Sequence, residues 1–437
     1  MSEERSRESR IPAGRLERLL RIGWLAGEAA LGGLAERARR IGDPQSAYHP
    51  VLSEANAERL TRRLSTLRGA AMKLGQLLSL EGEDFLPPEF SDALMALRAD
   101  ADAMPRSQLD RVLGRAWGRG WQERLEHFDW EPVAAASIGQ VHVGRHEGRT
   151  LAFKVQYPGV AESIESDVDN LASVFRLARL LPAEVDLEPV IAEAKRQLRC
   201  EADYRAEAAA LAHYRALMGA EDRCLVPSVL DEWTTRQVLA MDFLPGLPLE
   251  DLLGPEHRAA ERDRVAGLLL RILFRELFEW RFCQTDPNFA NYLYDARNGT
   301  LGLLDLGSAR EVPDWLSAAY LEIFRAGLAN NRGRLKEIAC EVGYFGPDER
   351  MDRVNSVVDM LELACEPFHR DGYDCGDSDL AKRIRERGFT LAFEQGFTRP
   401  PPPETMFLHR KIGGTFLLAS RLRARIAGRT LIEPFLA

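Results

Sequence analysis

The arrangement of polar residues around Asp286 constrains this 437-residue chain more than any other feature. The segment from Gln284 to Asn291 reads Gln-Thr-Asp-Pro-Asn-Phe-Ala-Asn, and an apolar run, Leu301 to Leu304, leads into Asp305-Leu306-Gly307. Phosphoryl transfer needs residues of these types, because the crowded negative oxygens of ATP must be bridged by Mg²⁺. Mg²⁺ is a hard cation that prefers oxygen ligands, so an Asp carboxylate and an Asn carbonyl on adjacent loops suit it.

Protein kinases place a nucleophile-orienting Asp, a metal-binding Asn and a second metal-binding Asp in the same order. The alternative is a pair of unrelated surface loops, since Asp and Asn are common turn residues. The Asp-x-Gly that follows a hydrophobic strand favours the kinase-like interpretation.

Composition excludes several classes of protein. The net charge of −9 and the pI of about 5.6 argue against a nucleic-acid-binding protein. The six cysteines are scattered without a Cys-x-x-Cys pair, which argues against zinc and favours reduced thiols in a cytoplasmic setting. Apolar runs are too short for a membrane span, and we see no signal-peptide pattern at the N-terminus.

The N-terminal part is expected to be helical after a charged, disordered start. Residues 15–40 have basic ends and a small, apolar middle in which Glu28 argues against a membrane span. Two interpretations remain open: an interfacial helix with Trp24 at an anionic lipid surface, or a helix that packs its small face against the protein or a second copy. Gly23-x-x-x-Gly27 offers a weak surface for a homodimer. In residues 54–100 a leucine stripe predicts another helix, and its Lys73-Leu74-Gly75-Gln76 would by pattern alone face solvent.

From Trp130 the pattern changes to short strands, as at the start of a kinase N-lobe. Ala134-Ala135-Ala136-Ser137 stands where a glycine-rich phosphate loop is expected, and alanines make a stiffer loop that approaches phosphate less freely. A hairpin at Gly148 leads to an apolar strand that carries Lys154. That lysine has an alternative as a surface side chain, but its place in the strand favours phosphate binding.

Helices are then predicted for residues 164–181 and 187–218, the second containing Glu201, Asp203 and Glu207. A kinase needs a helical Glu to pair with its strand Lys, whereas a solvated charged helix is the plain alternative. A strand ending at Met241 and a hinge-like connector beginning at Phe243 would hold the adenine ring. The remainder reads as a helical lobe, in which the basic helix 409–425 favours packing within the lobe over contact with anionic lipid.

These patterns predict an α+β, bilobal, protein-kinase-like fold with a small strand-rich N-lobe, a helical C-lobe and an added N-terminal helical extension. We expect four parts: residues 1–40 with the membrane-surface helix, 41–129 as the helical extension, 130–242 as the N-lobe with a helical insert, and 243–437 as the C-lobe.

By its motifs the chain resembles the UbiB-type atypical kinase family, in particular the branch of mitochondrial coenzyme Q kinase-like proteins and their bacterial relatives. The resemblance covers residues 10–427 and rests on four ordered motifs. These are Lys73-Leu74-Gly75-Gln76, Ala134-Ala135-Ala136-Ser137, Glu201-Ala202-Asp203 and Gln284-Thr285-Asp286-Pro287-Asn288.

The resemblance implies roles for these residues. The extension would fold over the active site, so Lys73 and Gln76 would face it, with Glu201 and Asp203 near Lys73. Lys154 would pair with Glu207, and residues 134–137, Met241 and Phe243 would contact ATP or ADP. Asn291 and Asp305 would hold Mg²⁺, and Asp286 would occupy the catalytic-Asp position. The resemblance also implies ATPase behaviour, peripheral membrane association in a bacterial cytoplasm or a mitochondrial matrix, and partners among ubiquinone-biosynthesis enzymes or lipid precursors.

The chain departs from protein kinases in ways that bear on function. His-Arg-Asp becomes Gln284-Thr285-Asp286, and Asp-Phe-Gly becomes Asp305-Leu306-Gly307. After Gly307 the chain runs directly toward a helix, without a long activation segment on which a protein substrate would dock. The leading hypothesis is therefore an ATPase that supports ubiquinone biosynthesis at a membrane surface. A nucleotide-gated lipid- or partner-binding protein is the alternative, and a protein kinase ranks third.

Overall fold

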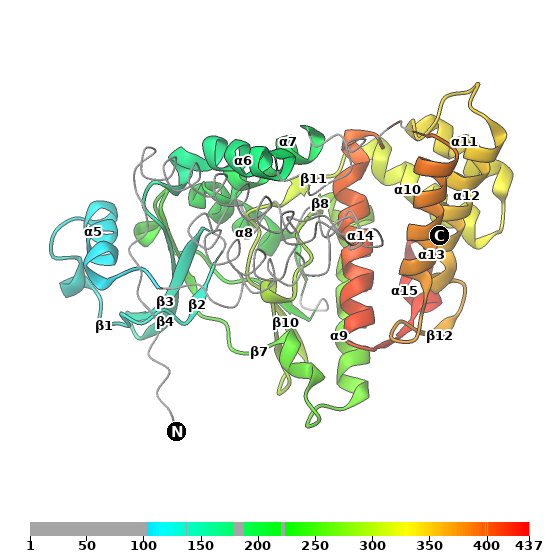
Figure 1. Cartoon of the computed structure of the whole chain (residues 1–437). Helices are drawn as coiled ribbons and strands as arrows, with labels where there is room; N and C mark the ends of the chain where they lie inside the picture. Colours follow the sequence, from blue (N-terminus) through cyan, green and yellow to red (C-terminus); the bar gives the residue numbers. More distant parts are fainter. Residues whose placement is uncertain are drawn as a thin grey trace, which may run out of the picture. The chain divides into compact units, whose positions relative to one another are not determined.

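The computed structural model describes residues 103–436 apart from 137, 178–187, 220–222, 398 and 400. The described residues divide into two compact units (Figure 1). Unit 1 contains those up to Ala209 together with Ser228–Phe243, and unit 2 contains Ala210–Pro227 and those from Leu244 onward. The predicted helices of the N-terminal extension, with Lys73 and Gln76, lie outside the described residues, as does Ser137.

Unit 1 is built on an antiparallel sheet. Its strands follow the order β1-β3-β4-β6, and β2 pairs with β3 beside β1. Strands β3 and β4 form the predicted hairpin, which turns through Glu147 and Gly148 with positive φ angles of 48° and 73°. The bounds are β1 (His127–Phe128), β2 (Ala134–Ala135), β3 (Gly139–His146), β4 (Arg149–Gln156) and β6 (Val238–Asp242).

Helix α5 (Arg106–Trp117) packs against this sheet through a core of large side chains. Trp121 and Trp233 are almost completely buried, and the Trp117 ring meets each of them edge-on at centroid distances of 5.2 and 4.9 Å. The other helices are α6 (Val160–Leu177), α7 (Glu188–Glu201) and α8 (Tyr204–Leu217). Helix α6 packs on α7, beside which it lies in Figure 1.

One helix prediction was wrong in this region. The single helix expected for residues 187–218 is two helices, α7 and α8, with a break at Ala202 and Asp203. The Asp203 carboxylate accepts hydrogen bonds from the backbone N–H groups of Arg205 and Ala206 at 3.1 and 3.3 Å. Asp is favoured before a helix because it satisfies such otherwise unpaired donors, so Asp203 begins a new helix.

Unit 2 contains a small sheet and a set of helices. The sheet has the order β5-β10-β9-β7, in which β9 and β10 form an antiparallel hairpin. Two further ribbons pair β8 with β11 and β12 with β13. The bounds are β5 (Cys224–Leu225), β7 (Leu247–Pro248), β8 (Phe282–Cys283), β9 (Tyr292–Asp295), β10 (Thr300–Leu303), β11 (Arg310–Glu311), β12 (Asp371–Asp374) and β13 (Arg425–Ala427).

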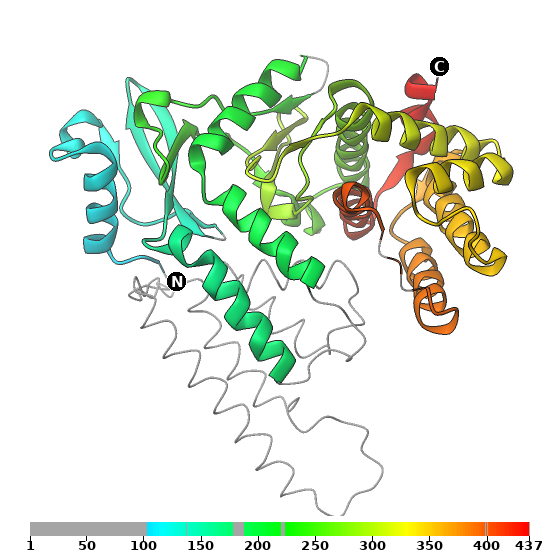
Figure 2. The ribbon, with the colours of Figure 1, turned by 90° about the horizontal axis from the view of Figure 1, so that it is seen from above.

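Two long helices, α9 (Ala259–Arg275) and α14 (Pro403–Arg421), pack against each other in unit 2 (Figures 1 and 2). Helix α9 continues as a π turn, Glu276–Trp280, which leads into β8. The other helices are α10 (Asp314–Leu328), α11 (Arg332–Val342), α12 (Met351–Cys365), α13 (Leu380–Phe389) and α15 (Gly428–Leu436). Within the described part of the chain, no helix combines the length and the apolar character needed to cross a membrane.

Candidate functional site

Lys154 on β4 and Glu207 on α8 form a buried ion pair in unit 1. The lysine Nζ lies 2.9 and 3.0 Å from the two carboxylate oxygens of Glu207, and the side chains are 8% and 0% exposed. The ammonium also lies 5.2 Å from the centre of the Tyr204 ring. The predicted pairing is therefore present, and the surface alternative for Lys154 is wrong.

The alanine segment is held on the same sheet as Lys154. Ala134 on β2 lies opposite Val141 on β3, and Val141 in turn lies opposite Lys154 on β4. Directly opposed residues of neighbouring strands share a face of the sheet, so Ala134 and Lys154 lie on one face. The side chains of Ala134 and Ala135 are exposed, and the Ala136 N–H donates to the Gly139 carbonyl oxygen at 2.9 Å. The segment that was expected to be a loop therefore begins as a short strand.

The remaining predicted residues of unit 1 lie at the edges of this sheet and at the α7–α8 junction. Glu201, the last residue of α7, is 7% exposed, and Asp203 caps α8. Met241 on β6 is buried opposite Ala152 of β4. Phe243 follows β6, donates its backbone N–H to the Thr150 carbonyl oxygen at 3.1 Å and is 44% exposed.

In unit 2 the backbone carbonyl oxygen of Asp286 accepts hydrogen bonds from other residues of the candidate catalytic loop. The Gln284 side-chain amide donates to this oxygen at 2.6 Å, and the Asn291 amide donates to it at 2.8 Å. The Asn288 backbone N–H donates to the same oxygen at 2.9 Å, so three groups of the loop share this one acceptor. Both amide groups are thereby oriented with their nitrogens toward Asp286.

The β9–β10 hairpin brings Asn291 and Asp305 to the same end of one ribbon. Asn291 immediately precedes β9, and Asp305 is the second residue after β10. The Leu304 N–H donates to the Asn291 carbonyl oxygen at 2.9 Å. The Asp305 carboxylate accepts from the Gly307 N–H at 2.9 Å, so the turn of the Asp-Leu-Gly motif holds this carboxylate. Asp286, Asn291 and Asp305 are thus gathered in unit 2 by one loop and one hairpin.

These side chains fit a hard divalent cation. Because the Asn291 amide nitrogen is used by Asp286, its Oδ1 is the atom that would face a metal, and carboxylate and amide oxygens are the ligands that Mg²⁺ takes. Among the described residues, no group of three or more His, Cys, Asp or Glu side chains is arranged to hold a metal ion. Asp286, Asn291 and Asp305 together offer two carboxylates and an amide oxygen, and oxygen ligands of this kind favour Mg²⁺ over zinc.

Beneath the loop lies a buried polar network that the sequence patterns did not predict. The Glu276 carboxylate accepts from the Gln284 backbone N–H at 3.0 Å and from the Tyr214 hydroxyl at 2.8 Å, and it pairs with Lys411 at 2.8 Å. The Lys411 ammonium also donates to the Gln284 side-chain oxygen at 3.1 Å. Both charged side chains are almost completely buried, at 0% and 2% exposure.

Electrostatics keep this network in a defined protonation state. Burial opposes the charge on Lys411, but the adjacent Glu276 carboxylate outweighs it and raises the lysine pKa. Burial, followed by the Glu276 charge, raises the pKa of Tyr214 and of the Cys283 thiol well above their usual ranges. These shifts favour the protonated ammonium of Lys411 and the protonated hydroxyl of Tyr214, which donates to Glu276.

Helix α14 contacts the loop at two further points. The Arg410 guanidinium donates to the Thr285 carbonyl oxygen through Nε at 2.8 Å and Nη2 at 2.6 Å. Gly414 faces Pro287 so closely that a Cβ at this position would lie 2.3 Å from the proline Cγ. Arg410 and Gly414, in the middle of this helix, therefore contact the loop within unit 2. The sequence offered only a weak signal for this contact, because a Cβ on the neighbouring Gly413 in the same helix would have nothing within 4 Å.

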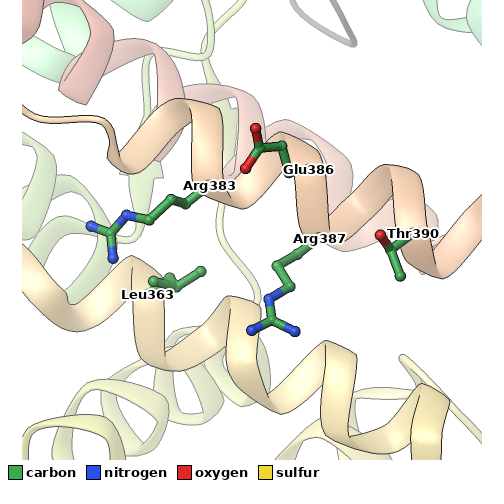
Figure 3. Close-up of a pocket in the computed structure, with 5 residues that line it drawn as sticks. All are labelled: Leu363, Arg383, Glu386, Arg387 and Thr390. Carbon is green, nitrogen blue, oxygen red and sulfur yellow. The ribbon is translucent and has the colours of Figure 1, made fainter.

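A cavity of about 390 Å³ lies elsewhere in unit 2, between α12 and α13. Figure 3 shows the Arg383 and Arg387 side chains extending from α13 toward the helix that carries Leu363. Arg383 pairs with Glu366 and Asp379, and Arg387 pairs with Asp359. Since carboxylates neutralise both guanidinium groups, this cavity is not a candidate phosphate site. Its lining residues are Leu363, Arg383, Glu386, Arg387 and Thr390.

The strand lysine with its helical glutamate, and the Asp, Asn and Asp of the second unit, define a protein of the kinase-like class. Residues 96–339 match the family model described as the ABC1 atypical kinase-like domain, so the chain belongs to the ABC1 atypical kinase family. The resemblance recognised in the sequence and the predicted fold class are both confirmed.

Curated relatives come from eukaryotes and bacteria. The chain is 38% identical to "Atypical kinase COQ8B, mitochondrial" of Rattus norvegicus, over 98% of this chain and 82% of the rat protein. It is 33% identical to "Atypical kinase COQ8, mitochondrial" of Schizosaccharomyces pombe, over 98% and 70%. It is 26% identical to "Probable protein kinase UbiB" of Xylella fastidiosa, over 77% and 62%.

A solved structure supports the fold. The chain resembles the Mycobacterium tuberculosis protein Rv3197, solved in complex with erythromycin, with a TM-score of 0.62 and 24% identity. The match covers 88% of this chain and 96% of the other. At this level of identity the likeness concerns the fold alone.

Proposed function

We propose that this protein is a Mg²⁺-dependent ATPase of the atypical kinase type that supports ubiquinone biosynthesis at a membrane surface. The observation that carries the proposal is the gathering of Asp286, Asn291 and Asp305 around one carbonyl and one hairpin in unit 2. It is supported by the buried Lys154–Glu207 pair in unit 1. The biosynthetic role rests on the family resemblance and on relatives with names such as "Atypical kinase COQ8, mitochondrial".

Each residue has a task that follows from its chemistry. Lys154, held by Glu207, would neutralise phosphate charge, and Ala134 to Ser137 would cover the phosphates, while Met241 and Phe243 would contact the adenine. Asp286 would orient water or a small hydroxyl acceptor for in-line attack. Asn291 and Asp305 would hold Mg²⁺, which stabilises charge on the transferring phosphoryl group.

The N-terminal motif residues complete the proposal. Lys73 and Gln76 would face the active site from the helical extension, with Glu201 and Asp203 beside them. An extension in that place would keep a peptide out of the site. ADP would occupy the same nucleotide site, and an anionic lipid surface and enzymes or precursors of ubiquinone biosynthesis would be the partners.

The chain after Gly307 argues against a protein kinase. Arg310 and Glu311 form β11, which pairs with β8, and α10 begins at Asp314. Six residues therefore separate the Asp-Leu-Gly motif from the next helix. This leaves no room for the long segment on which kinases bind protein substrates, so water or a small acceptor is favoured.

The test is phosphate release from Mg-ATP, with and without anionic liposomes, by wild type, Asp286→Asn and Asp305→Asn. We expect liposomes to stimulate the wild type and each substitution to lower the rate at least ~100-fold, the usual size of an acid–base or electrostatic contribution. Asp295→Asn is the matched control, because Asp295 ends β9 at the far end of the same hairpin. Its rate should equal that of the wild type.

Two results would contradict the proposal in different ways. Wild-type rates in both Asp286→Asn and Asp305→Asn would show that these carboxylates do not act on ATP. An absence of hydrolysis in the wild type, with a normal thermal shift on adding Mg-ADP, would favour the nucleotide-gated binding protein.

A further inference from the structure

We propose that Lys411 on α14 is a positioning residue for Asp286. Its ammonium orients the side-chain amide of Gln284, and that amide holds the Asp286 backbone carbonyl. The kinetic part of this inference rests on the proposed ATPase function, whereas the positioning itself is a property of the protein without nucleotide.

The orientation of the Gln284 amide follows from the groups that surround it. The Lys411 Nζ lies 3.1 Å and the Tyr292 hydroxyl 3.3 Å from the amide oxygen, and both donate to it. An ammonium has hydrogens only and no acceptor, so the opposite orientation would set the amide N–H groups against the ammonium and the amide oxygen against the Asp286 carbonyl oxygen. Burial raises the pKa of Tyr292, which keeps its hydroxyl protonated. The amide nitrogen must therefore point to the Asp286 carbonyl, where it donates at 2.6 Å.

This orientation affects two other groups of the site. The Asp286 carbonyl also accepts from the Asn291 amide at 2.8 Å, so the same oxygen orients the loop backbone and the side chain of Asn291. If the Gln284 amide turned, the carbonyl would lose its shortest hydrogen bond and keep those from the Asn291 side chain and the Asn288 backbone N–H, so the peptide plane of Asp286 would be held less firmly. A displacement of about 1 Å at such a position is enough to lower a reaction rate ~100-fold.

The buried charge of Lys411 would be hard to explain by stability alone. Taking an ammonium and a carboxylate out of water costs several kcal/mol per ion, and apolar replacements of similar volume are often neutral or stabilising. Glu276 holds the lysine at 2.8 Å, and it also accepts from the backbone N–H of Gln284. Glu276 thus binds the backbone of Gln284, and Lys411 binds its side chain.

The experiment compares three variants with the wild type. Lys411→Met alone leaves the Glu276 carboxylate buried without its lysine, which is destabilising, so the decisive variant is the double change Glu276→Gln with Lys411→Met. The first change keeps a side-chain oxygen that can accept from Gln284 and Tyr214, and the second keeps an unbranched side chain in place of the lysine stem, so the fold should recover. Gln284→Met is the complementary variant, because it leaves Lys411 paired with Glu276 and removes the donor to Asp286. Lys382→Met on α13, whose side chain is 70% exposed, is the control.

For the double variant and for Gln284→Met we expect a thermal midpoint near that of wild type and a KM for Mg-ATP within about twofold. The kcat should fall about 10- to 100-fold, as expected for a misplaced reactive group. Hydrogen exchange of peptides covering residues 284–291, measured without nucleotide, should be faster, because the Asn288 N–H donates to the Asp286 carbonyl oxygen and the Asn291 N–H donates to the Asn288 carbonyl oxygen. The control should match the wild type in every measurement.

Wild-type kcat and wild-type exchange in both variants would overturn the inference and leave Lys411 a stabilising role. If the wild type releases no phosphate, the proposed function fails, and the exchange comparison alone then decides whether Lys411 positions the loop.

Discussion

Both units bury a lysine against a glutamate. Lys154 pairs with Glu207 in unit 1, and Lys411 pairs with Glu276 in unit 2. A buried ion pair is weak evidence for stability, because desolvation offsets most of the attraction between the charges. The first pair holds a cation where phosphate is expected, and the second holds the loop that carries Asp286. At the scale of residues, these two buried ion pairs therefore serve to position functional groups more than to stabilise the fold.

His142 on β3 provides a prediction about pH. Its side chain is completely buried, and burial lowers its pKa below the usual 6.5. Gln140 uses its amide oxygen to accept from the Met104 N–H at 2.7 Å, so its amide nitrogen must donate to His142 Nε2. The other ring nitrogen then donates to the Asp129 carbonyl oxygen at 2.9 Å. Protonation would place a hydrogen on Nε2 against the Gln140 amide, so the folded protein favours neutral histidine.

The consequence is a loss of stability in acid. Above pH 6.5 the histidine is neutral in both states, and its full contribution is present. As the pH falls below 6.5, the unfolded chain binds a proton that the folded protein resists, so the free energy of unfolding decreases. His142→Gln should cost about 1–3 kcal/mol at pH 7.5 through the loss of the Asp129 hydrogen bond. This deficit should shrink between pH 7 and pH 5, as measured by denaturant unfolding. A deficit that stays constant with pH would show that His142 titrates normally.

At the scale of elements, α14 is the helix that the loop around Asp286 depends on. Neighbouring glycines in this helix provide a matched pair for a test. A Cβ on Gly414 would lie 2.3 Å from Pro287, whereas a Cβ on Gly413 would have nothing within 4 Å. Gly414→Ala should therefore destabilise the protein by about 1–3 kcal/mol through overpacking and lower phosphate release. Gly413→Ala should stabilise it by roughly 0.5–1 kcal/mol, since alanine favours the helix, and leave phosphate release unchanged.

Thermal unfolding and phosphate release of the two alanine variants, measured side by side, check this prediction. If Gly414→Ala is as stable and as active as Gly413→Ala, then α14 can move away from Pro287, and it does not constrain the loop.

The elements also show why some features were predictable from sequence and others were not. The Lys154 strand, its hairpin and the β9–β10 hairpin follow from local patterns of apolar residues and turns, so these elements could be predicted. The α7–α8 break depends on one side chain, Asp203, whose carboxylate accepts a hydrogen bond from the backbone N–H of Arg205. The Lys411–Glu276 contact joins residues far apart in the chain, and no local sequence pattern around either residue predicts the contact. Long-range polar contacts of this kind carry no periodic signal.

At the scale of the whole molecule, the question is which part of the chain meets a membrane. Helix α14 was one sequence-based option, but Arg410 and Lys411 are bound to Thr285, Gln284 and Glu276. Its exposed basic residues are at its end, at Arg421 and just beyond, at Arg423. Residues 1–40 lie outside the described part of the chain and contain nine arginines and six glutamates, a net charge of +3 in a chain of −9. Attraction to anionic lipid is worth about 1 kcal/mol for each basic residue near the surface.

We therefore expect deletion of residues 1–40 to weaken binding to anionic liposomes at least about tenfold in a flotation assay, and raised salt to weaken the binding of the full chain. The double variant Arg421→Gln with Arg423→Gln is the control, and it should float like the wild type. Thermal unfolding of the shortened chain should match that of the full chain, because the segment removed precedes the family domain at residues 96–339. The opposite pattern, with binding kept by the shortened chain and lost by the arginine variant, would place the lipid contact at the end of α14. Binding that survives in both would assign it to another surface, and the membrane part of the proposed function would then need a different basis from the charge of the N-terminal segment.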